Sequence, residues 1–105
     1  MRHGKGKYVD KSGEMYQGLW QEDTMHGDGT YLFATGAQYT GTFENNAFHG
    51  NGHYTWHDGA SYTGRFRGNQ MHDEEGVYLD NDGVKWAGKF TNGKYFNGKN
   101  YLILR

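Results

Sequence analysis

The sequence contains neither cysteine nor proline in its 105 residues, and little of it is aliphatic. The absence of cysteine excludes disulfides, thiol catalysis and cysteine-ligated zinc, and it is compatible with a reducing, cytosolic setting. Hydrophobic residues make up only 34% of the chain, and the mean hydropathy is -1.03. This composition is too poor for a thick aliphatic core between two layers of secondary structure. A chain of this length forms one domain rather than two.

Signals for nucleic-acid and membrane partners are also missing. The formal net charge is -1 at pH 7, and lysine and arginine are scattered, so no basic patch indicates binding to nucleic acid. No apolar run approaches the length that spans a membrane. The N-terminal segment lacks the apolar centre of a signal peptide. We therefore expect a cytoplasmic protein.

Aromatic residues and glycine, in contrast, are abundant. Aromatic residues account for 17% of the chain, tyrosine alone occurs 9 times, and there are 18 glycines. The aromatic content argues against disorder. We expect the buried surface to come mainly from rings packed against the backbone.

Two motifs repeat in step along the chain. The first, Tyr16-Gln17-Gly18-Leu19-Trp20, recurs at residues 39–43, 62–66 and 86–90, so that successive copies lie 23, 23 and 24 residues apart. The second, His-Gly-x-Gly, begins at His3, His26 and His49, and at His72 it is degraded by one inserted residue. Two motifs locked in one register indicate an internal repeat.

The copies divide the chain into one continuous array. We expect a partial repeat at residues 1–15, repeats at 16–38, 39–61 and 62–85, and a partial repeat with a C-terminal cap at 86–105. The cap is predicted because residues 95–101 keep an Asn-Gly turn but lose the register, and terminal repeats are often atypical. The first unit lacks its Tyr-x-Gly-x-Trp half, which leaves open whether the chain is complete or part of a longer array.

Within each copy the marked residues alternate with a period of two, as in a β-strand. Tyr39, Gly41 and Phe43 share one face, and the turn-like pairs Asn45-Asn46 and Asp58-Gly59 bound the strands. Each unit is therefore predicted to be a β-hairpin. Consecutive hairpins give an all-β antiparallel meander of roughly nine strands about 4.8 Å apart.

One face of the predicted sheet collects nearly all the rings, with glycines between them. A glycine inside a strand indicates that something approaches the backbone closely, and we expect a neighbouring ring to lie over it. A single layer cannot bury both sides of large rings, so this face should also bind a partner. The predicted partner-binding residues are Tyr16, Trp20, Tyr31, Phe33, Tyr39, Phe43, Tyr54, Trp56, Tyr62, Phe66, Tyr78, Trp86 and Phe90. The opposite face, which includes Thr40, His53 and Arg65, is expected to be mostly wet.

With these motifs the sequence resembles the MORN repeat family (membrane occupation and recognition nexus), whose unit is close to YxGxW, a short turn, HGxGxY and an xDG turn. The resemblance covers about residues 3–92. It departs from the family pattern at Trp86, which replaces tyrosine, at the phenylalanines that replace tryptophan in three copies, and at the broken motif of His72. The short apolar tail at residues 101–104 is similar to that of the small MORN repeat-containing protein 2 group.

The resemblance implies an elongated, twisted, single-layer sheet that acts as a scaffold or adaptor. It implies a groove lined by rings that holds a partner's helix or peptide, and a place in a ciliary, flagellar or cytoskeletal assembly. Two alternatives stay open. One is a peripheral adaptor that binds membrane phospholipid, although the polybasic cluster usual for such binding is missing. The other is a structural homodimer, because open sheet edges invite pairing.

The motif histidines and glycines are predicted to be structural: His3, His26, His49, His72, Gly18, Gly41, Gly64 and Gly88. We expect each histidine to donate a ring hydrogen bond to a backbone carbonyl of its own motif. His49, His53 and His57 would share one face of a helix, but four residues of strand advance about 13 Å, whereas zinc ligands lie about 2.1 Å from the ion. We therefore expect neither a metal site nor a cofactor.

Acidic residues offer no better basis for catalysis. Glu74-Glu75 and Asp80-Asn81-Asp82 lie near one another in the sequence, but a catalytic carboxylate pair needs a shielded pocket and a shifted pKa. An open single-layer sheet gives little shielding, so we expect a solvated bulge and a turn. The calcium loop and the phosphate loop are both absent. We therefore predict that the chain is not an enzyme.

Overall fold

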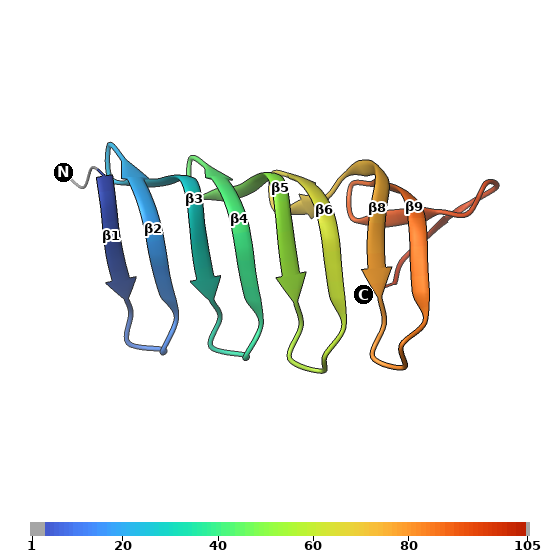
Figure 1. Ribbon diagram of the computed structural model, residues 1–105, viewed down its shortest axis with the longest axis horizontal. Helices are drawn as coiled ribbons and strands as arrows, with labels where there is room; N and C mark the ends of the chain where they lie inside the picture. The colour runs from blue at the N-terminus through green and yellow to red at the C-terminus, as the bar shows by residue number, and fades with distance from the viewer. Residues whose placement is uncertain (1–3, 105) are drawn as a thin grey trace.

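The computed structural model describes residues 4–104 and shows one open antiparallel sheet with its strands side by side along the long axis (Figure 1). Its principal extents are 47, 24 and 15 Å. The strands are β1 (Gly4–Val9), β2 (Met15–Gln21), β3 (Thr24–Leu32), β4 (Gln38–Glu44), β5 (Ala47–Thr55), β6 (Ser61–Arg67), β7 (Gln70–Met71), β8 (Asp73–Leu79), β9 (Lys85–Thr91), β10 (Lys94–Phe96) and β11 (Tyr101–Leu102). They follow one another in chain order, with β7 beside β6. The predicted all-β meander of hairpins is confirmed.

The sheet has 11 strands, more than the nine expected. The return strand of the last full repeat is interrupted at His72, which separates β7 from β8. The residues after β9 also form strands, because β10 pairs with β9 and β11 pairs with β10. Within residues 4–104 the chain has no helix long and apolar enough to cross a membrane.

Two kinds of turn close the hairpins, and each follows from the local sequence. At one end of the strands the two central turn residues both have positive φ, for example 49° at Asn45 and 68° at Asn46. This is the type I′ geometry that suits the twist of a two-residue hairpin, and asparagine tolerates it better than most residues. At the other end the turn contains a left-handed glycine, such as Gly59 with φ 94°. The turns predicted at Asn45-Asn46 and Asp58-Gly59 are therefore both present.

Rings and glycines form two rows that run across the strands. Tyr16, Tyr31, Tyr39 and Tyr54 stand directly opposite one another on successive strands. Glycines form the second row, two residues away from the tyrosine on each strand. They pair across successive strands from Gly6 to Gly64, and Gly76 then pairs with Gly88. Because the glycines have no side chain, the tyrosine rings can lie flat across the second row.

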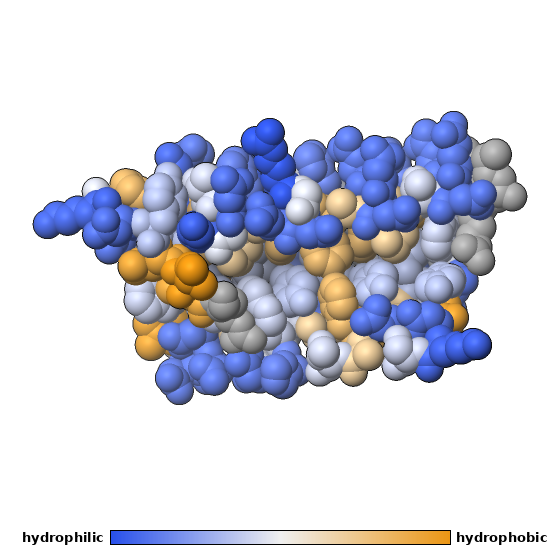
Figure 2. Space-filling view, turned by 180° about the vertical axis from the view of Figure 1, so that it is seen from behind, coloured by the Kyte–Doolittle hydropathy of each residue, from blue (hydrophilic) through white to orange (hydrophobic). Residues whose placement is uncertain are grey.

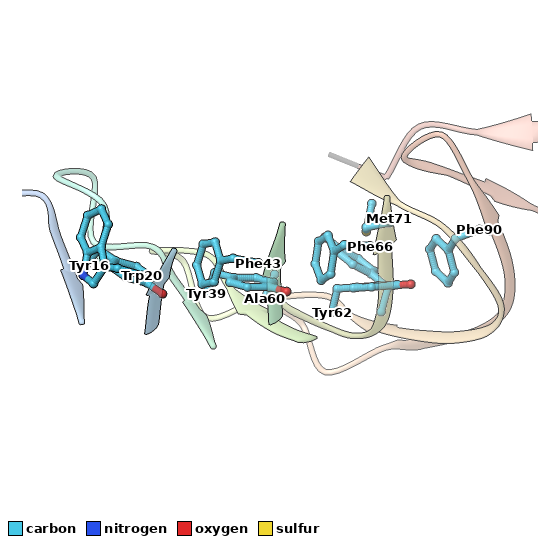
Figure 3. Close-up of a cluster of buried hydrophobic side chains, with 10 residues drawn as sticks. Tyr16, Trp20, Tyr39, Phe43, Ala60, Tyr62, Phe66, Met71 and Phe90 are labelled. Atoms are coloured by element: carbon cyan, nitrogen blue, oxygen red, sulfur yellow. The ribbon is translucent and has the colours of Figure 1, made fainter. Parts of the chain in front are cut away.

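The predicted cover of the glycines by rings is confirmed. A Cβ atom at Gly52 would lie 2.5 Å from the hydroxyl oxygen of Tyr39, and one at Gly29 would lie 2.5 Å from that of Tyr16. The rings of Tyr16, Tyr39 and Tyr62 are 0% exposed, and they repeat along the molecule, with phenylalanines between them (Figure 3). The core is therefore a line of rings held against backbone, not a second layer of secondary structure.

A β-bulge accompanies each of the first two covered tyrosines. The register shifts between Gly18 and Trp20, and again between Gly41 and Phe43. The hydroxyl of Tyr16 donates a hydrogen bond to the carbonyl of Leu19 at 2.7 Å, and Tyr39 does the same to Thr42 at 2.7 Å. The bulge takes this carbonyl out of the regular ladder, and the tyrosine satisfies it.

The degraded motif at His72 forms a wider irregularity. The register shifts between Asp73 and Gly76, and the Asp73 carboxylate accepts backbone hydrogen bonds from Arg65 at 2.9 Å and Glu75 at 3.0 Å. These backbone bonds, chiefly the one from Glu75, hold the pKa of Asp73 below its usual value. Glu74 and Glu75 are exposed, as the predicted solvated bulge requires.

The C-terminal hairpin covers the end of the array. Tyr95 pairs with Phe90, and its hydroxyl donates to the carbonyl of Ala87 at 3.2 Å. The Tyr95 ring also approaches the Cβ position of Gly88 to 3.4 Å. Trp86 stands where the earlier repeats have their opening tyrosine, but it has no hydroxyl. Tyr95 instead brings a ring close to a glycine and donates a hydroxyl hydrogen bond to a backbone carbonyl. Leu104, close to the end of the chain, packs against the ring core.

Candidate interaction groove

The ring face alternates between buried and half-buried tyrosines. Those at the start of a repeat, such as Tyr39, are fully buried, whereas Tyr31 and Tyr54 on the return strands are only partly covered. The opening-strand rings lie across glycines and beneath phenylalanines of the next repeat, as with Tyr39 and Phe66, whose centroids are 5.1 Å apart at 86°. The rings of Tyr31 and Tyr54 therefore reach the surface, whereas Tyr78 on the return strand β8 is buried.

These exposed rings line a groove on the ring face, which we call the ring groove. Its walls are formed by Met25, Tyr31, Phe33, Asn46, Phe48, Tyr54, Trp56, Phe66, Asn69, Gln70, Met71 and Gly93, and its volume is about 500 Å³. The aromatic floor is continuous, with ring centroids 4.7 Å apart for Tyr31 and Phe33, and 4.6 Å apart for Tyr54 and Trp56. Figure 2 shows the apolar band of this face between two hydrophilic rims.

The tips of the type I′ turns form one rim and are fixed to the preceding repeat. The backbone N–H of Asn46 donates to the carbonyl of Met25 at 3.1 Å, and the N–H of Met25 donates to the Asn46 side chain at 2.8 Å. Asn69 makes the same two contacts with Phe48, at 3.1 and 2.8 Å. Each tip is therefore held over the repeat before it, which positions the groove wall.

The ring groove is electrically neutral. None of its lining residues carries a formal charge, and the polar groups on its rim are the side-chain amides of Asn46, Asn69 and Gln70. At one end, Tyr31 donates a hydrogen bond to the carboxylate of Glu14 at 2.8 Å. Burial, together with this carboxylate, raises the pKa of Tyr31 to about 12. Such a surface suits uncharged apolar groups rather than ions.

The structure separates the predicted partner-binding residues into two groups. The residues that line the ring groove are Tyr31, Phe33, Tyr54, Trp56 and Phe66. The residues that are buried beneath or beside it are Tyr16, Trp20, Tyr39, Phe43, Tyr62, Tyr78 and Phe90, while Trp86 is half-buried at the end near the cap. The rings of Tyr16, Tyr39, Tyr62 and Phe90 are at most 1% exposed and cannot contact a partner in this arrangement, so fewer residues can form the contact surface than the sequence indicated.

Sequence analysis missed one row of the groove. Met25, Phe48 and Met71 each precede the motif histidine by one residue, and they stand 23 residues apart. Phe48 stacks on Tyr39 at 4.0 Å and 12° and also contacts Phe33. Counting back by two from Tyr54 reaches Phe48, so the period-two pattern and the repeat could have found this row.

The prediction for the motif histidines is wrong in its hydrogen bonding. Among the described residues, no motif histidine donates a ring hydrogen bond to a backbone carbonyl; His3 lies outside the described residues. His49 instead lies 3.5 Å from the Glu44 carboxylate, with about half of each side chain exposed, and His72 Nδ1 accepts a bond from the Asn92 N–H at 3.4 Å. His49 is exposed, whereas His26 and His72 are half-buried, and the His49 carbonyl accepts a hydrogen bond from the Thr42 hydroxyl.

Rings or backbone atoms closely approach three of the four glycines predicted to be structural. Cβ atoms at Gly18 and Gly41 would lie 2.5 Å from Cα of the glycine on the facing strand, and one at Gly64 would lie 2.6 Å from the Tyr62 hydroxyl. Gly88 has more space, since Tyr95 comes only to 3.4 Å. These glycines leave room for the core rings and do not form the surface of the groove.

The side chains of residues 4–104 form no cluster suited to a metal ion. No group of three histidine, aspartate or glutamate side chains in this part of the chain could hold a metal ion. His53 Nδ1 lies 2.7 Å from the Thr63 hydroxyl, a contact between neighbouring strands. Asp80 accepts bonds from the N–H groups of Asp82 and Val84, and these backbone bonds, led by Val84, lower its pKa. Asp80 therefore organises a turn, as the sequence predicted for this segment.

Comparison with known proteins identifies the repeat. The MORN repeat model matches residues 1–15, 16–38, 39–61 and 62–72. A comparison with curated protein sequences finds no match. The family match spans more than half of the chain, and three of its units begin at Tyr16, Tyr39 and Tyr62, the covered tyrosines of β2, β4 and β6. This chain belongs to the MORN repeat family.

Proposed function

We propose that this chain is a non-enzymatic scaffold whose ring groove binds the apolar face of a partner protein, presented on a helix or on an extended peptide. MORN repeats are commonly protein- or membrane-interaction repeats, and the family is non-catalytic. The ring groove carries the proposal: Tyr31, Phe33, Tyr54 and Trp56 stay half-buried although the fold has enclosed their neighbours. Contiguous exposed rings of this kind are typical of interaction sites.

The chemistry of the groove indicates which side chains it takes. Its neutral amide rim offers no ion-pair partner, so charged side chains gain nothing by entering it. The chain's own Leu104 already packs against the ring core, which is a direct example of an aliphatic side chain on this face. We therefore propose that the partner presents leucine, isoleucine or methionine, in the helix-in-groove mode or as an extended strand.

We place this scaffold in the cytoplasm, in a ciliary, flagellar or other cytoskeletal assembly. This rests on the family resemblance alone. As part of the same proposal, we suggest that the chain is related to the small MORN repeat-containing protein 2 group, on the basis of its apolar tail at residues 101–104. Localisation of the tagged protein in ciliated cells tests it, and exclusive staining of another compartment would refute it.

A peptide titration tests groove binding. The probe is a synthetic amphipathic helix with leucines at positions i, i+3, i+4 and i+7 and no charge on that face. We expect its addition to shift the NMR signals of Tyr54 and the Trp56 indole, and Trp56→Ala to weaken binding at least about tenfold, as for an interface hot spot. Thr40→Ala, on the opposite face, is the matched control and should bind normally. Equal binding by both folded variants would contradict the proposal.

Two alternatives make different predictions for the same protein. A peripheral membrane adaptor would float with vesicles that contain phosphoinositides at physiological salt. A structural homodimer would show twice the monomer mass by light scattering at high concentration. Flotation or dimerisation that survives Trp56→Ala would favour these alternatives over groove binding.

A further inference from the structure

Two rows of turns border the ring face, one at each end of the strands (Figure 1). The first row consists of the type I′ tips, in which both central residues have positive φ: Glu22-Asp23, Asn45-Asn46, Gly68-Asn69 and Asn92-Gly93. The second row consists of residues 10–14, 33–37, 56–60 and 80–84, each with a left-handed glycine or the residues that flank one. A segment that lies along the ring groove therefore passes between these two rows and meets their charges.

The charge of the type I′ tips changes sign along the array. The first tip carries Glu22 and Asp23, the second Glu44, the third Arg67 and the fourth Lys94, and all five residues are exposed. Glu44 and Arg67 occupy the same position in two successive repeats, so the charge reverses where the backbone geometry is equivalent. This row is therefore negative beside β2–β5 and positive beside β6–β10.

The second row of turns is mostly acidic. Its acidic residues are Asp10, Glu14, Asp58, Asp80 and Asp82, and its basic residues are Lys11 and His57. The Ser12 hydroxyl, together with backbone N–H groups of the turn, lowers the pKa of Asp10, and backbone bonds led by that of Val84 lower the pKa of Asp80. Both carboxylates therefore stay charged at neutral pH. Toward β2 both rows are negative, whereas toward β9 the two rows have opposite signs.

The ring groove contains the same set of side chains twice. The equivalent pairs, 23 residues apart, are Tyr31 and Tyr54, Phe33 and Trp56, and Phe48 and Met71. One repeat is two strands wide, about 9.6 Å. An α-helix advances about 10.5 Å between residues i and i+7 and returns to nearly the same side, whereas an extended strand advances about 10 Å in three residues and then faces the opposite side. A helix can therefore place one apolar residue in each half of the groove.

We propose that the segment held by the ring groove is an amphipathic helix with apolar residues at i and i+7, basic residues flanking them at the end over β2–β5, and acidic residues at the end beside Arg67 and Lys94. This inference rests on the proposed function, because it requires an occupied groove. Exposed ion pairs contribute little affinity, but complementary charges select the orientation of a complex. The apolar contacts hold the helix, and the charges of the two rows decide which of its ends lies over β3.

Two methionine methyl groups report the orientation of the bound helix. Met25 and Met71 both line the groove, and they stand two repeats apart, which is about 19 Å. The probe is a synthetic helical peptide with leucines at i, i+3, i+4 and i+7, flanked by lysines in one half and glutamates in the other, with a nitroxide at its lysine end. A nitroxide broadens NMR signals, and the effect falls off steeply with distance. We expect the Met25 methyl signal to broaden at least about threefold more than that of Met71.

A charge-reversed variant is the matched control. Glu22→Lys/Glu44→Arg/Arg67→Glu/Lys94→Glu inverts the order of charges along the tips and leaves the net charge of the chain unchanged. We expect the Met71 methyl to become the more strongly broadened signal in this variant. In the unmodified protein the preference should disappear at about 1 M salt, where the screening length is about 3 Å. The same peptide with a central proline should bind at least about tenfold more weakly, because proline breaks the helix.

Three results would overturn the inference. They are equal broadening of the two methyl groups at low salt, the same preference in the charge-reversed variant, and equal binding of the proline-containing peptide. If binding is still weakened by Trp56→Ala in these cases, groove binding itself stands and only the helix or its orientation is wrong. A peptide that does not bind the unmodified protein at all would refute both the proposed function and this inference.

Discussion

Adding a single methyl group at Gly52 should disrupt the core of this protein. A Cβ atom there would lie 2.5 Å from both Cε1 and the hydroxyl oxygen of Tyr39. The Tyr39 ring is 0% exposed, and it is held by Phe43, Phe48 and Phe66, with centroids 4.0 to 5.1 Å away. The ring therefore has no free space into which it could move.

The size of the effect follows from these contacts. Overpacking a close-packed core costs about 1–3 kcal/mol. If the ring moves, its hydrogen bond to the Thr42 carbonyl, now 2.7 Å long, is also lost, which costs about 1 kcal/mol. We therefore expect Gly52→Ala to lower the free energy of unfolding by about 2–4 kcal/mol. Elsewhere in a strand the same change would stabilise the protein by about 0.5–1 kcal/mol, because alanine loses less backbone entropy than glycine.

A double-mutant cycle with Tyr39→Leu separates the ring contact from other effects. Leucine lacks all three tyrosine atoms that approach Gly52, so Gly52→Ala should be nearly neutral or stabilising in that background. Urea unfolding of the four proteins, followed by tryptophan fluorescence and circular dichroism, gives the coupling energy. If Gly52→Ala costs the same with leucine as with tyrosine at position 39, the ring does not cover the glycine and our account of the core is wrong.

Three further measurements examine the hydrogen bonds and ionisation of the same core. Tyr39→Phe removes only the hydroxyl, so it should cost about 1 kcal/mol in urea unfolding, and an unchanged midpoint would show that the bulge carbonyl of Thr42 is satisfied otherwise. Asn46→Gly keeps the positive φ of the turn but removes the side-chain bond to Met25, so we expect the free energy of unfolding to fall by about 0.5–1.5 kcal/mol. Equal stability would show that the Asn46 amide does not hold the groove wall in place. Burial raises the pKa values of Tyr16 and Tyr39 from 10.0 to about 12. The stability contributed by the neutral rings is therefore complete below pH 10 and is lost as the pH rises through about 12, by an amount on the order of 2–3 kcal/mol for each ring. Unfolding midpoints that stay constant from pH 9 to 12 would contradict this.

Much of the fold could be predicted because the repeat constrains it twice. Tyr39, Gly41 and Phe43 recur every 23 or 24 residues with a period of two inside each copy, and a strand is the element that places such residues on one face. The short Asn45-Asn46 pair then requires a tight hairpin. Periodicity of this kind is a local property of the sequence, so it can be read without knowing how the side chains pack.

The candidate site could be predicted only in part. Tyr54 and Trp56 were correctly placed on the ring face and line the groove, but the same pattern also included Tyr39, which is buried. Opening and return strands carry the same residue types with the same alternation, so the pattern does not distinguish their burial. The groove wall at Asn46 depends on contacts with Met25, 21 residues away, which local periodicity does not reveal.

The sequence by itself determined the hairpins of the repeats, their turns and the face that gathers the rings, because these depend on short-range periodicity and turn chemistry. Tertiary structure alone decided which rings stay at the surface. Tyr16, Tyr39 and Tyr62 are covered because glycines and a phenylalanine of the next repeat meet around them, whereas Tyr31 and Tyr54 stay half-buried. It also decided that the His49 ring lies beside the Glu44 carboxylate, a contact that the repeat pattern does not reveal. The ring groove is therefore a consequence of how equivalent repeats pack against one another.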